Sequence, residues 1–279
     1  WTEQTGWIRL PGISGDDTFT ANDLNTESQG VYRADNHLWL WAASNGRIFH
    51  AGPSEMMHWI SVENGGTMEE VGLRADDSYS MKGTTVMFDV DRILKVGGAE
   101  SYDRDHPAKD NSYVIDFSDE NNVTVTPTVN RLTYSRTMHN STVLPNGEVL
   151  VTGGLDHAEV FSDVGARLTA EIYSPEFNTW RTVAGMQVPR TYHSVAILMV
   201  DGRVFVGGGG LCDNSNLAEC VNHTDAEIYS PPYLFNNDGS LATRPTISAP
   251  ETADYNTSIP VTGSSGITDF NLIRFSSAT

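Results

Sequence analysis

Short stretches of alternating apolar and polar residues recur along the chain, each ending in a glycine pair or its remnant. They span residues 46–53, 92–98, 147–154 and 202–210, at spacings of 45, 56 and 54 residues. Alternation with a period of two predicts β-strands, and glycine at a strand end allows positive φ and a close approach of neighbouring backbones. No amphipathic helix is predicted. A repeat of this length indicates the four-stranded blades of a kelch-type β-propeller.

Turn signals support this pattern. The Asn146-Gly147 and Asp201-Gly202 pairs precede two of the glycine-rich strands, and such pairs favour hairpins between the first and second strands of a blade. A second shared element, at 170–180 and 226–235, is interpreted as the outer strands of a blade. We therefore expect an all-β fold with about four blades over residues 1–243.

The character of the sequence changes at Arg244. Residues 244–279 contain short β segments, little charge and no glycine-pair strand, which predicts the first strands of a separate, Ig-like β-sandwich domain. Four blades do not close a ring and leave unpaired edges. We therefore expect the sequence to be part of a longer polypeptide, with the remaining blades of that polypeptide as its nearest partners.

The net charge and the lengths of the apolar runs disfavour two classes of partner, nucleic acids and membranes. The chain has 36 acidic and 17 basic residues, a formal net charge of −19. This excess of negative charge disfavours binding to phosphate backbones, so nucleic acid is not an expected partner. No run of about 18 apolar residues is present, so no membrane insertion is expected.

Cysteines and sequons point to a secreted protein. Cys212 and Cys220 flank a short polar loop, and a local disulfide is favoured over two free thiols. Asn-x-Ser/Thr triplets are candidate glycosylation sites. Asn140 falls in a predicted buried strand and is the least suitable acceptor. The four candidates are Asn122, Asn140, Asn222 and Asn256.

Longer motifs carry a family resemblance. RTYHSVAILMVDGRVFVGGGGLC at 190–212, followed by HTDAEIYSPPYLFNNDGSLATRPTI, resembles the galactose and glyoxal oxidases, which are copper radical oxidases. VYRADNHLWLW at 31–41, HAGPSEMMHW at 50–59 and LTYSRTMHNSTVLPNGEVLVTGG at 132–154 match the same family in the same order. The resemblance covers nearly the whole chain.

The resemblance implies a seven-bladed propeller with copper near its axis. Family members oxidise a primary alcohol, an aldehyde or a carbohydrate and reduce O2 to H2O2. By motif, Tyr192 corresponds to the axial metal ligand that also acts as the catalytic base, His193 to an equatorial ligand, and Arg33 to a substrate-binding arginine. Neutral imidazole suits Cu(II), and a tyrosinate can accept a substrate proton.

The same resemblance implies that the site is incomplete in this sequence. The cross-linked cysteine and tyrosine of the radical cofactor would lie before Trp1, and a second histidine would follow Thr279 directly. The alternative function is therefore a non-catalytic kelch propeller that serves as a structural or glycan-binding module of a larger extracellular assembly.

Structural interpretations remain open for several residues. Arg-x-x-His is also a common kelch pattern, and His139 occupies the repeat position of His193 without any sign of metal binding. The loop ESYDRDHP is better explained as a solvated turn than as a metal loop, and Met56 and Met57 as packing. The residues considered on these grounds are Asp103, Asp105 and His106, and His50 and His58.

Overall fold

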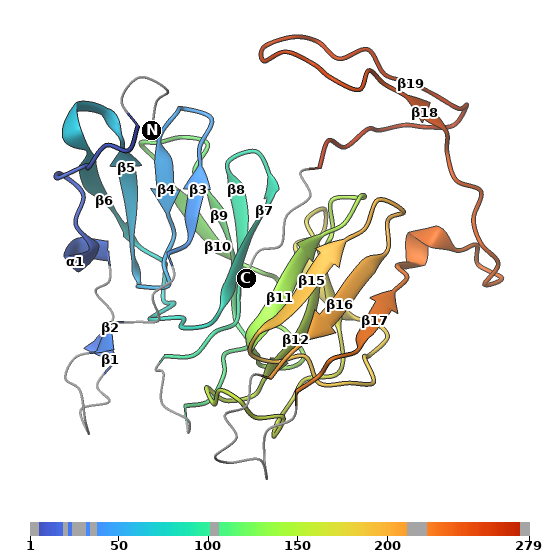
Figure 1. The fold of residues 1–279 in the computed structure, drawn as a ribbon, viewed down its shortest axis with the longest axis horizontal. Helices are drawn as coiled ribbons and strands as arrows, with labels where there is room; N and C mark the ends of the chain where they lie inside the picture. The colour runs from blue at the N-terminus through green and yellow to red at the C-terminus, as the bar shows by residue number, and fades with distance from the viewer. Residues whose placement is uncertain are drawn as a thin grey trace.

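The computed structural model describes residues 6–18, 22–23, 32–33, 38–100, 106–210 and 222–273. Within these ranges the chain is almost entirely β-structure and turns, as Figure 1 shows. The exceptions are a four-residue helix, α1 (Gly15–Thr18), and the 3-10 turns η1 (Glu63–Gly65) and η2 (Pro232–Leu234). In the described part, none of the helices has the length and apolarity needed to span a membrane.

The body consists of consecutive antiparallel sheets in which each strand pairs with the next along the chain. Between residues 40 and 229, three successive sheets have four strands each and the fourth has three, so the expected all-β fold with propeller-like blades is confirmed. The strands are β3 (Leu40–Ala42), β4 (Ile48–His50), β5 (Met56–Ser61) and β6 (Thr67–Leu73); β7 (Thr84–Asp89), β8 (Arg92–Val96), β9 (Ser112–Asp116) and β10 (Thr124–Pro127); β11 (Thr137–Val143), β12 (Val149–Leu155), β13 (Glu171–Ser174) and β14 (Thr179–Thr182); and β15 (Ser194–Leu198), β16 (Val204–Gly208) and β17 (Ala226–Tyr229).

The predicted hairpins form where the turn signals lie. β11 pairs with β12 and β15 with β16, and Gly147 and Gly202 in the two turns have φ of +82° and +81°. Glycine reaches this region without the steric penalty of a Cβ. The glycine-rich stretches therefore form the second strand of each sheet.

One element differs from the prediction. The 170–180 segment gives the two outer strands β13 and β14, but the described part of 226–235 gives a single strand, β17, followed by η2. Pro231 and Pro232 lie where a second strand would begin. Because proline has no N–H to donate to a ladder, pairing stops there.

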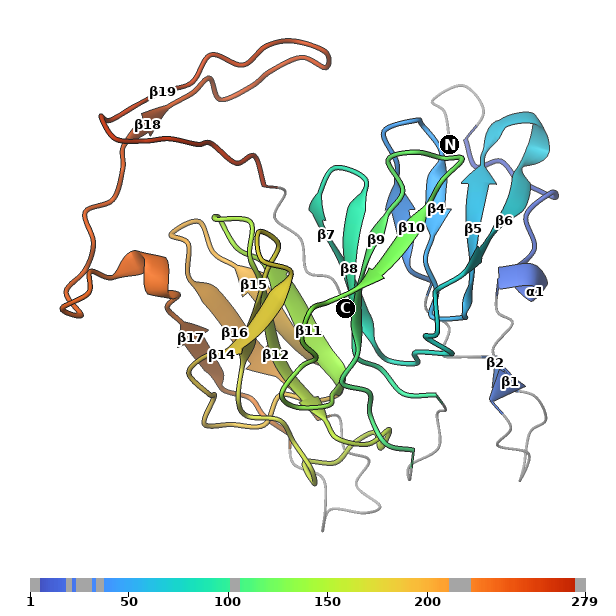
Figure 2. The ribbon, with the colours of Figure 1, turned by 180° about the vertical axis from the view of Figure 1, so that it is seen from behind.

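Apolar side chains fill the spaces between neighbouring sheets. One cluster includes Phe49, Trp59 and Phe117, where the β3–β6 sheet faces the β7–β10 sheet. Further clusters join each following pair of sheets, with Leu94 and Val151 in one and Leu150 and Val206 in the other. The inner strands β7, β11 and β15 lie next to one another, as Figures 1 and 2 show. This arrangement brings residues from three sheets together along one edge.

Buried arginines repeat with the sheets. Arg136 and Arg190 are 54 residues apart, and neither side chain is exposed. Arg136 donates from Nη1 to the Gly153 carbonyl (2.8 Å), and Arg190 donates from Nη1 to the Gly208 carbonyl (3.0 Å). These arginines tie the start of each sheet to its glycine-rich strand, which is a structural role.

Beyond Arg244 the chain leaves the sheets. β18 (Ile247–Ser248) and β19 (Thr262–Gly263) form a two-stranded ladder on a segment that arches away from the body in both views of the ribbon (Figures 1 and 2). It returns to the body where Asn271 Nδ2 donates to the Pro145 carbonyl at 2.9 Å. The domain division at residue 244 and the sandwich assignment remain predictions.

Candidate metal centre

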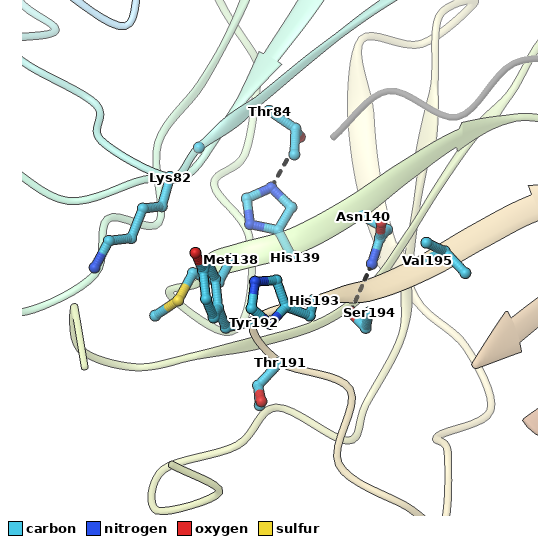
Figure 3. Close-up of a pocket in the computed structure, with 11 residues that line it drawn as sticks. Lys82, Thr84, Met138, His139, Asn140, Thr191, Tyr192, His193, Ser194 and Val195 are labelled. Carbon is cyan, nitrogen blue, oxygen red and sulfur yellow. Dashed lines mark hydrogen bonds between the residues drawn. The ribbon is translucent and has the colours of Figure 1, made fainter. Parts of the chain in front are cut away.

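A pocket of about 410 Å³ lies where the starts of β7, β11 and β15 meet. Figure 3 shows the side chains around it, with the His139, Tyr192 and His193 rings close to the Met138 side chain in this view. The lining residues are Lys82, Gly83, Thr84, Met138, His139, Asn140, Thr191, Tyr192, His193, Ser194 and Val195. The structure therefore places Tyr192 and His193 together in a pocket.

Tyr192 and His193 sit directly before β15, outside the strand. His193 has φ of +67°, a left-handed conformation that costs free energy for a residue with a Cβ and is concentrated at functional sites. Gly210 holds both residues. Its N–H donates to the Tyr192 carbonyl (3.1 Å), and its carbonyl lies 2.8 Å from His193 Nδ1. Gly210 itself has φ of +104°, which explains why the segment is rich in glycine.

The hydrogen bond from His193 to Gly210 fixes the tautomer of the imidazole. A backbone carbonyl only accepts hydrogen bonds, so Nδ1 carries the proton and Nε2 presents its lone pair. Metal-binding histidines commonly use one ring nitrogen in this way to orient the other toward the metal. His193 is exposed and Tyr192 is half-buried, so the pair offers one imidazole nitrogen and one phenol oxygen as donors for a metal.

Aromatic packing restrains the same pair. The Tyr192 and His193 rings lie 3.7 Å apart between centroids, tilted by 36°. Phe161 meets the edge of Tyr192 at 5.1 Å and 83°. Phe161 comes from the loop between β12 and β13, and Asp163 of this loop pairs with His223 Nε2 at 2.9 Å. The loop therefore places the Phe161 ring against Tyr192.

Phe161 was not among the residues predicted for the site. Its side chain is 40 % exposed, and its φ is +59°. An aromatic residue in the stretch AEVFSDVGA, between a glycine-pair strand and an outer strand, is the signal that could have found it. Its contact with Tyr192 joins segments 31 residues apart (192 − 161).

His139 takes a different role from His193 despite the shared repeat position. In the earlier sheet the left-handed residue is Met138, with φ of +55°, and His139 follows it inside β11. His139 is only 3 % exposed, and its Nε2 lies 3.0 Å from Thr84 Oγ1. Burial, then the charges of Arg136 and Lys95, lowers the pKa of His139 well below its ordinary value, so the ring is neutral.

The remaining candidate residues lie elsewhere or outside the described part. Arg33 lies in β2 (Tyr32–Arg33), paired with β1 (Asn22–Asp23), and its side chain is outside the described part. Cys212, Cys220, Asp103 and Asp105 also lie outside the described residues. Within the described ranges, no cluster of three or more His, Cys, Asp or Glu side chains is placed to hold a metal.

His50 and His58 form a buried pair across β4 and β5. Their Nδ1 atoms are 3.0 Å apart, and His50 Nε2 lies 3.0 Å from the Gly52 carbonyl. Burial and the proximity of His58 lower the pKa of His50 to about 3. Met57 is buried in the adjoining hydrophobic cluster. Neither histidine lines the pocket of the described residues.

The four sequons differ in exposure. Asn140 is 2 % exposed within β11 and donates from Nδ2 to Ser194 Oγ, whereas Asn122, Asn222 and Asn256 are exposed. A glycan needs an accessible acceptor amide, so only the exposed three remain candidates.

Comparisons with known proteins identify the family of this chain. Residues 87–233 match the family model described as the glyoxal oxidase N-terminus. The chain is 37% identical to a galactose oxidase of Gibberella zeae strain PH-1 over 98% of this chain and 40% of that protein. A second Gibberella zeae galactose oxidase is 36% identical with the same coverage. The chain thus spans about two fifths of the length of these relatives.

More distant and structural matches point the same way. The aldehyde oxidase GLOX1 of Arabidopsis thaliana is 33% identical over 36% of this chain and 17% of that protein. A solved structure, a fungal alcohol oxidase of the AA5 family in complex with copper, superposes with a TM-score of 0.76 at 34% identity. This match covers 86% of the present chain and 48% of the other.

Proposed function

The chain belongs to the family of galactose and glyoxal oxidases, and from this premise we propose that it carries part of the copper site of an extracellular oxidase. The reaction proposed is the two-electron oxidation of a primary alcohol or an aldehyde, with reduction of O2 to H2O2. The observation that carries the proposal is the Tyr192–His193 pair, fixed by Gly210 and open to the pocket.

Copper is the metal that this donor set and the relatives favour. A structural neighbour is described in complex with copper, and imidazole is a good ligand for Cu(II). His193 would bind through Nε2, because Nδ1 is engaged by the Gly210 carbonyl. Copper bound there would accept and return single electrons next to the substrate oxygen.

Tyr192 would act on the substrate as a base. Its hydroxyl oxygen, as tyrosinate, would take the proton of the substrate hydroxyl, and a base must lie within hydrogen-bond reach of the proton that it removes. The Tyr192 ring is held between His193 and Phe161, so the oxygen keeps its position during proton transfer. Arg33 is proposed to donate hydrogen bonds to further substrate oxygens, for which a guanidinium fork is suited.

Two further ligands complete the proposed site. Family resemblance assigns them to a second histidine and to a tyrosine cross-linked to a cysteine, contributed by the remaining blades and the following domain of the same polypeptide. The chain covers 40% of the length of its curated relatives, which leaves room for these groups. Without them, a structural or glycan-binding propeller is the competing function.

The first test examines the protein as it is produced by its source. Peptide mass spectrometry should find sequence before Trp1 and after Thr279, including a thioether-linked Cys-Tyr peptide and a histidine directly after Thr279. Upstream blades that lack this cysteine or tyrosine would contradict the oxidase and leave the competing function.

Copper titration of the same full-length protein gives the second test. His193→Ala removes one donor, so we expect copper affinity to fall by at least about tenfold and peroxide release to be lost. His106→Ala is the matched control, because His106 does not line the pocket of the described residues. Unchanged copper affinity in His193→Ala would overturn the metal assignment.

A further inference from the structure

Two residues that line the pocket, His139 and Asn140 on β11, each have one buried polar side-chain atom without a protein partner. The atoms are Nδ1 of His139 and Oδ1 of Asn140. The other end of each side chain is engaged, His139 with Thr84 and Asn140 with Ser194. Buried polar groups are costly unless a hydrogen bond compensates them. An unpaired atom in a pocket wall therefore points to an oxygen of a bound molecule.

His139 is held rigidly in the position that leaves Nδ1 free. Thr84 Oγ1 lies 3.0 Å from Nε2 and 2.6 Å from Ser141 Oγ, which makes a short chain of hydrogen bonds behind the ring. Figure 3 shows the bond from Thr84 to one ring nitrogen, with the other nitrogen on the side of the ring away from Thr84. The free nitrogen is thus oriented by the fold before any ligand binds.

The chemistry of a neutral imidazole selects the class of ligand. If Nε2 donates to Thr84, then Nδ1 accepts; if Thr84 donates instead, Nδ1 carries the proton and donates. Thr84 and Ser141 are both hydroxyls, so their chain can run in either direction. A hydroxyl group both donates and accepts, and it suits either tautomer. A carboxylate only accepts and an ammonium only donates, so each suits only one of the two tautomers.

The surroundings of the free nitrogen add an apolar surface. The Met138 and Val195 side chains line the same pocket, and a thioether adapts to irregular carbon skeletons. The Tyr192–His193 pair lies in the same pocket, so a molecule whose reacting carbon is near that pair can extend toward β11.

We propose that Nδ1 of His139 is a hydrogen-bonding subsite for a hydroxyl of an alcohol or polyol bound beside Tyr192 and His193. The assignment of that molecule as substrate rests on the proposed function and sharpens it. The preferred substrate carries a second hydroxyl in addition to the one that reacts. The two histidines of the repeat then bind different groups: His193 binds the metal and His139 binds the substrate.

The test needs no copper. The full-length protein, free of copper, is labelled with ¹⁵N-histidine and titrated with ethylene glycol, and in parallel with 1,2-dimethoxyethane, the ether that lacks hydroxyls. We expect the glycol, and not the ether, to shift the Nδ1 resonance of His139 in a saturable manner. Loss of one neutral hydrogen bond predicts about fivefold weaker glycol binding in His139→Gln, in which the amide nitrogen replaces Nε2 and nothing replaces Nδ1.

His50→Gln is the matched control. It makes the same exchange at another buried histidine, one that does not line the pocket of the described residues, so glycol binding should be kept. Equal loss of binding in both variants would assign His139 a merely structural role and overturn the subsite. The subsite would also be overturned if the Nδ1 resonance responds to neither compound, or if Nδ1 is hydrogen-bonded to a water that glycol does not displace.

The outcome is independent of the metal. If copper affinity is absent while the glycol shift depends on Nδ1, the proposed oxidase fails and the hydroxyl subsite stands. If copper binds and glycol does not, the subsite alone fails.

Discussion

At the scale of the residue, a displacement of one position separates a structural histidine from a candidate ligand. His139 and His193 share a repeat position, but positive φ falls on Met138 in one sheet and on His193 itself in the other. β11 therefore already contains His139, whereas β15 begins after His193. His139 turns into the buried side of a strand, and His193 stays exposed in the pocket.

Gly210 offers a test of how the backbone presents His193. Alanine at φ of +104° is strained by about 1–2 kcal/mol and would shift the carbonyl that fixes His193 Nδ1. We expect Gly210→Ala to lower both the melting temperature and the copper affinity of the full-length protein. Calorimetry and copper titration measure the two effects.

Gly147 supplies the matched control for that substitution. Its φ is +82°, and a Cβ there would meet nothing within 4 Å. Gly147→Ala should therefore carry a similar strain in a distant hairpin and leave copper affinity unchanged. Equal copper affinities in the two variants would show that the Gly210 carbonyl does not orient His193.

At the scale of the element, local signals predicted the sheets and missed what depends on distant contacts. The Asn146-Gly147 and Asp201-Gly202 turns form as expected, because hairpin geometry is set by the two turn residues themselves. The Tyr192–His193 site was reached through the family motif. Phe161 was missed because its role depends on the path of a long loop toward β15, which no local pattern encodes.

The β4–β5 histidine pair predicts a pH dependence of stability. Burial and His58 lower the pKa of His50 from 6.5 to about 3. Between these values the unfolded chain binds more protons than the folded chain, so the free energy of unfolding falls as the pH drops from about 6.5 to about 3. The loss is on the order of a few kcal/mol. When the free energy of unfolding is measured with denaturant at several pH values in this range, it should depend less on pH in His50→Gln than in the unsubstituted protein.

His157 gives the opposite sign and serves as the control. Burial acts to lower its pKa, but hydrogen bonds to Asp156 and Glu159 outweigh burial and raise it above 6.5. The stabilisation that His157 provides is present below its ordinary pKa and is lost as the pH rises through the raised value. His157→Gln should abolish the gain in the free energy of unfolding that accompanies a fall in pH through the raised pKa toward 6.5, and should leave the pH dependence below 6.5 unchanged. An altered pH dependence between 6.5 and 3 in that variant would contradict the assignment.

At the scale of the whole molecule, a packed series of sheets carries a loosely attached C-terminal segment. Tyr255 is 99 % exposed on that segment, whereas Tyr173 in β13 is 1 % exposed. We expect brief chymotrypsin treatment of this chain to cut after Tyr255 and to leave the bond after Tyr173 intact. Mass spectrometry of the products checks this order.

The cut chain also reports on the stability of the body. The segment beyond Tyr255 is joined to the sheets by the hydrogen bond from Asn271 to Pro145 and by partial burial of Ile273. Because few contacts are broken, the melting temperature should change by no more than about 2–4 °C, the equivalent of roughly 1 kcal/mol in a domain of about 150–250 residues. A larger decrease would show that the segment stabilises the sheets.

The one-residue offset between β11 and β15 has a consequence for how such a protein acquires chemistry. Duplicated units start with identical side chains in identical places, and their shared packing resists change. The left-handed residue lies one repeat position later before β15 than in β11, and β15 begins three repeat positions later. This turns an interior histidine outward without replacing it, while Arg136 and Arg190 keep the same anchoring contacts in both copies. A new reactive group can thus emerge from a scaffold residue when a strained backbone angle moves by one position, with no further strained angle added, and the same shift offers a route for installing metal sites in other blades by design.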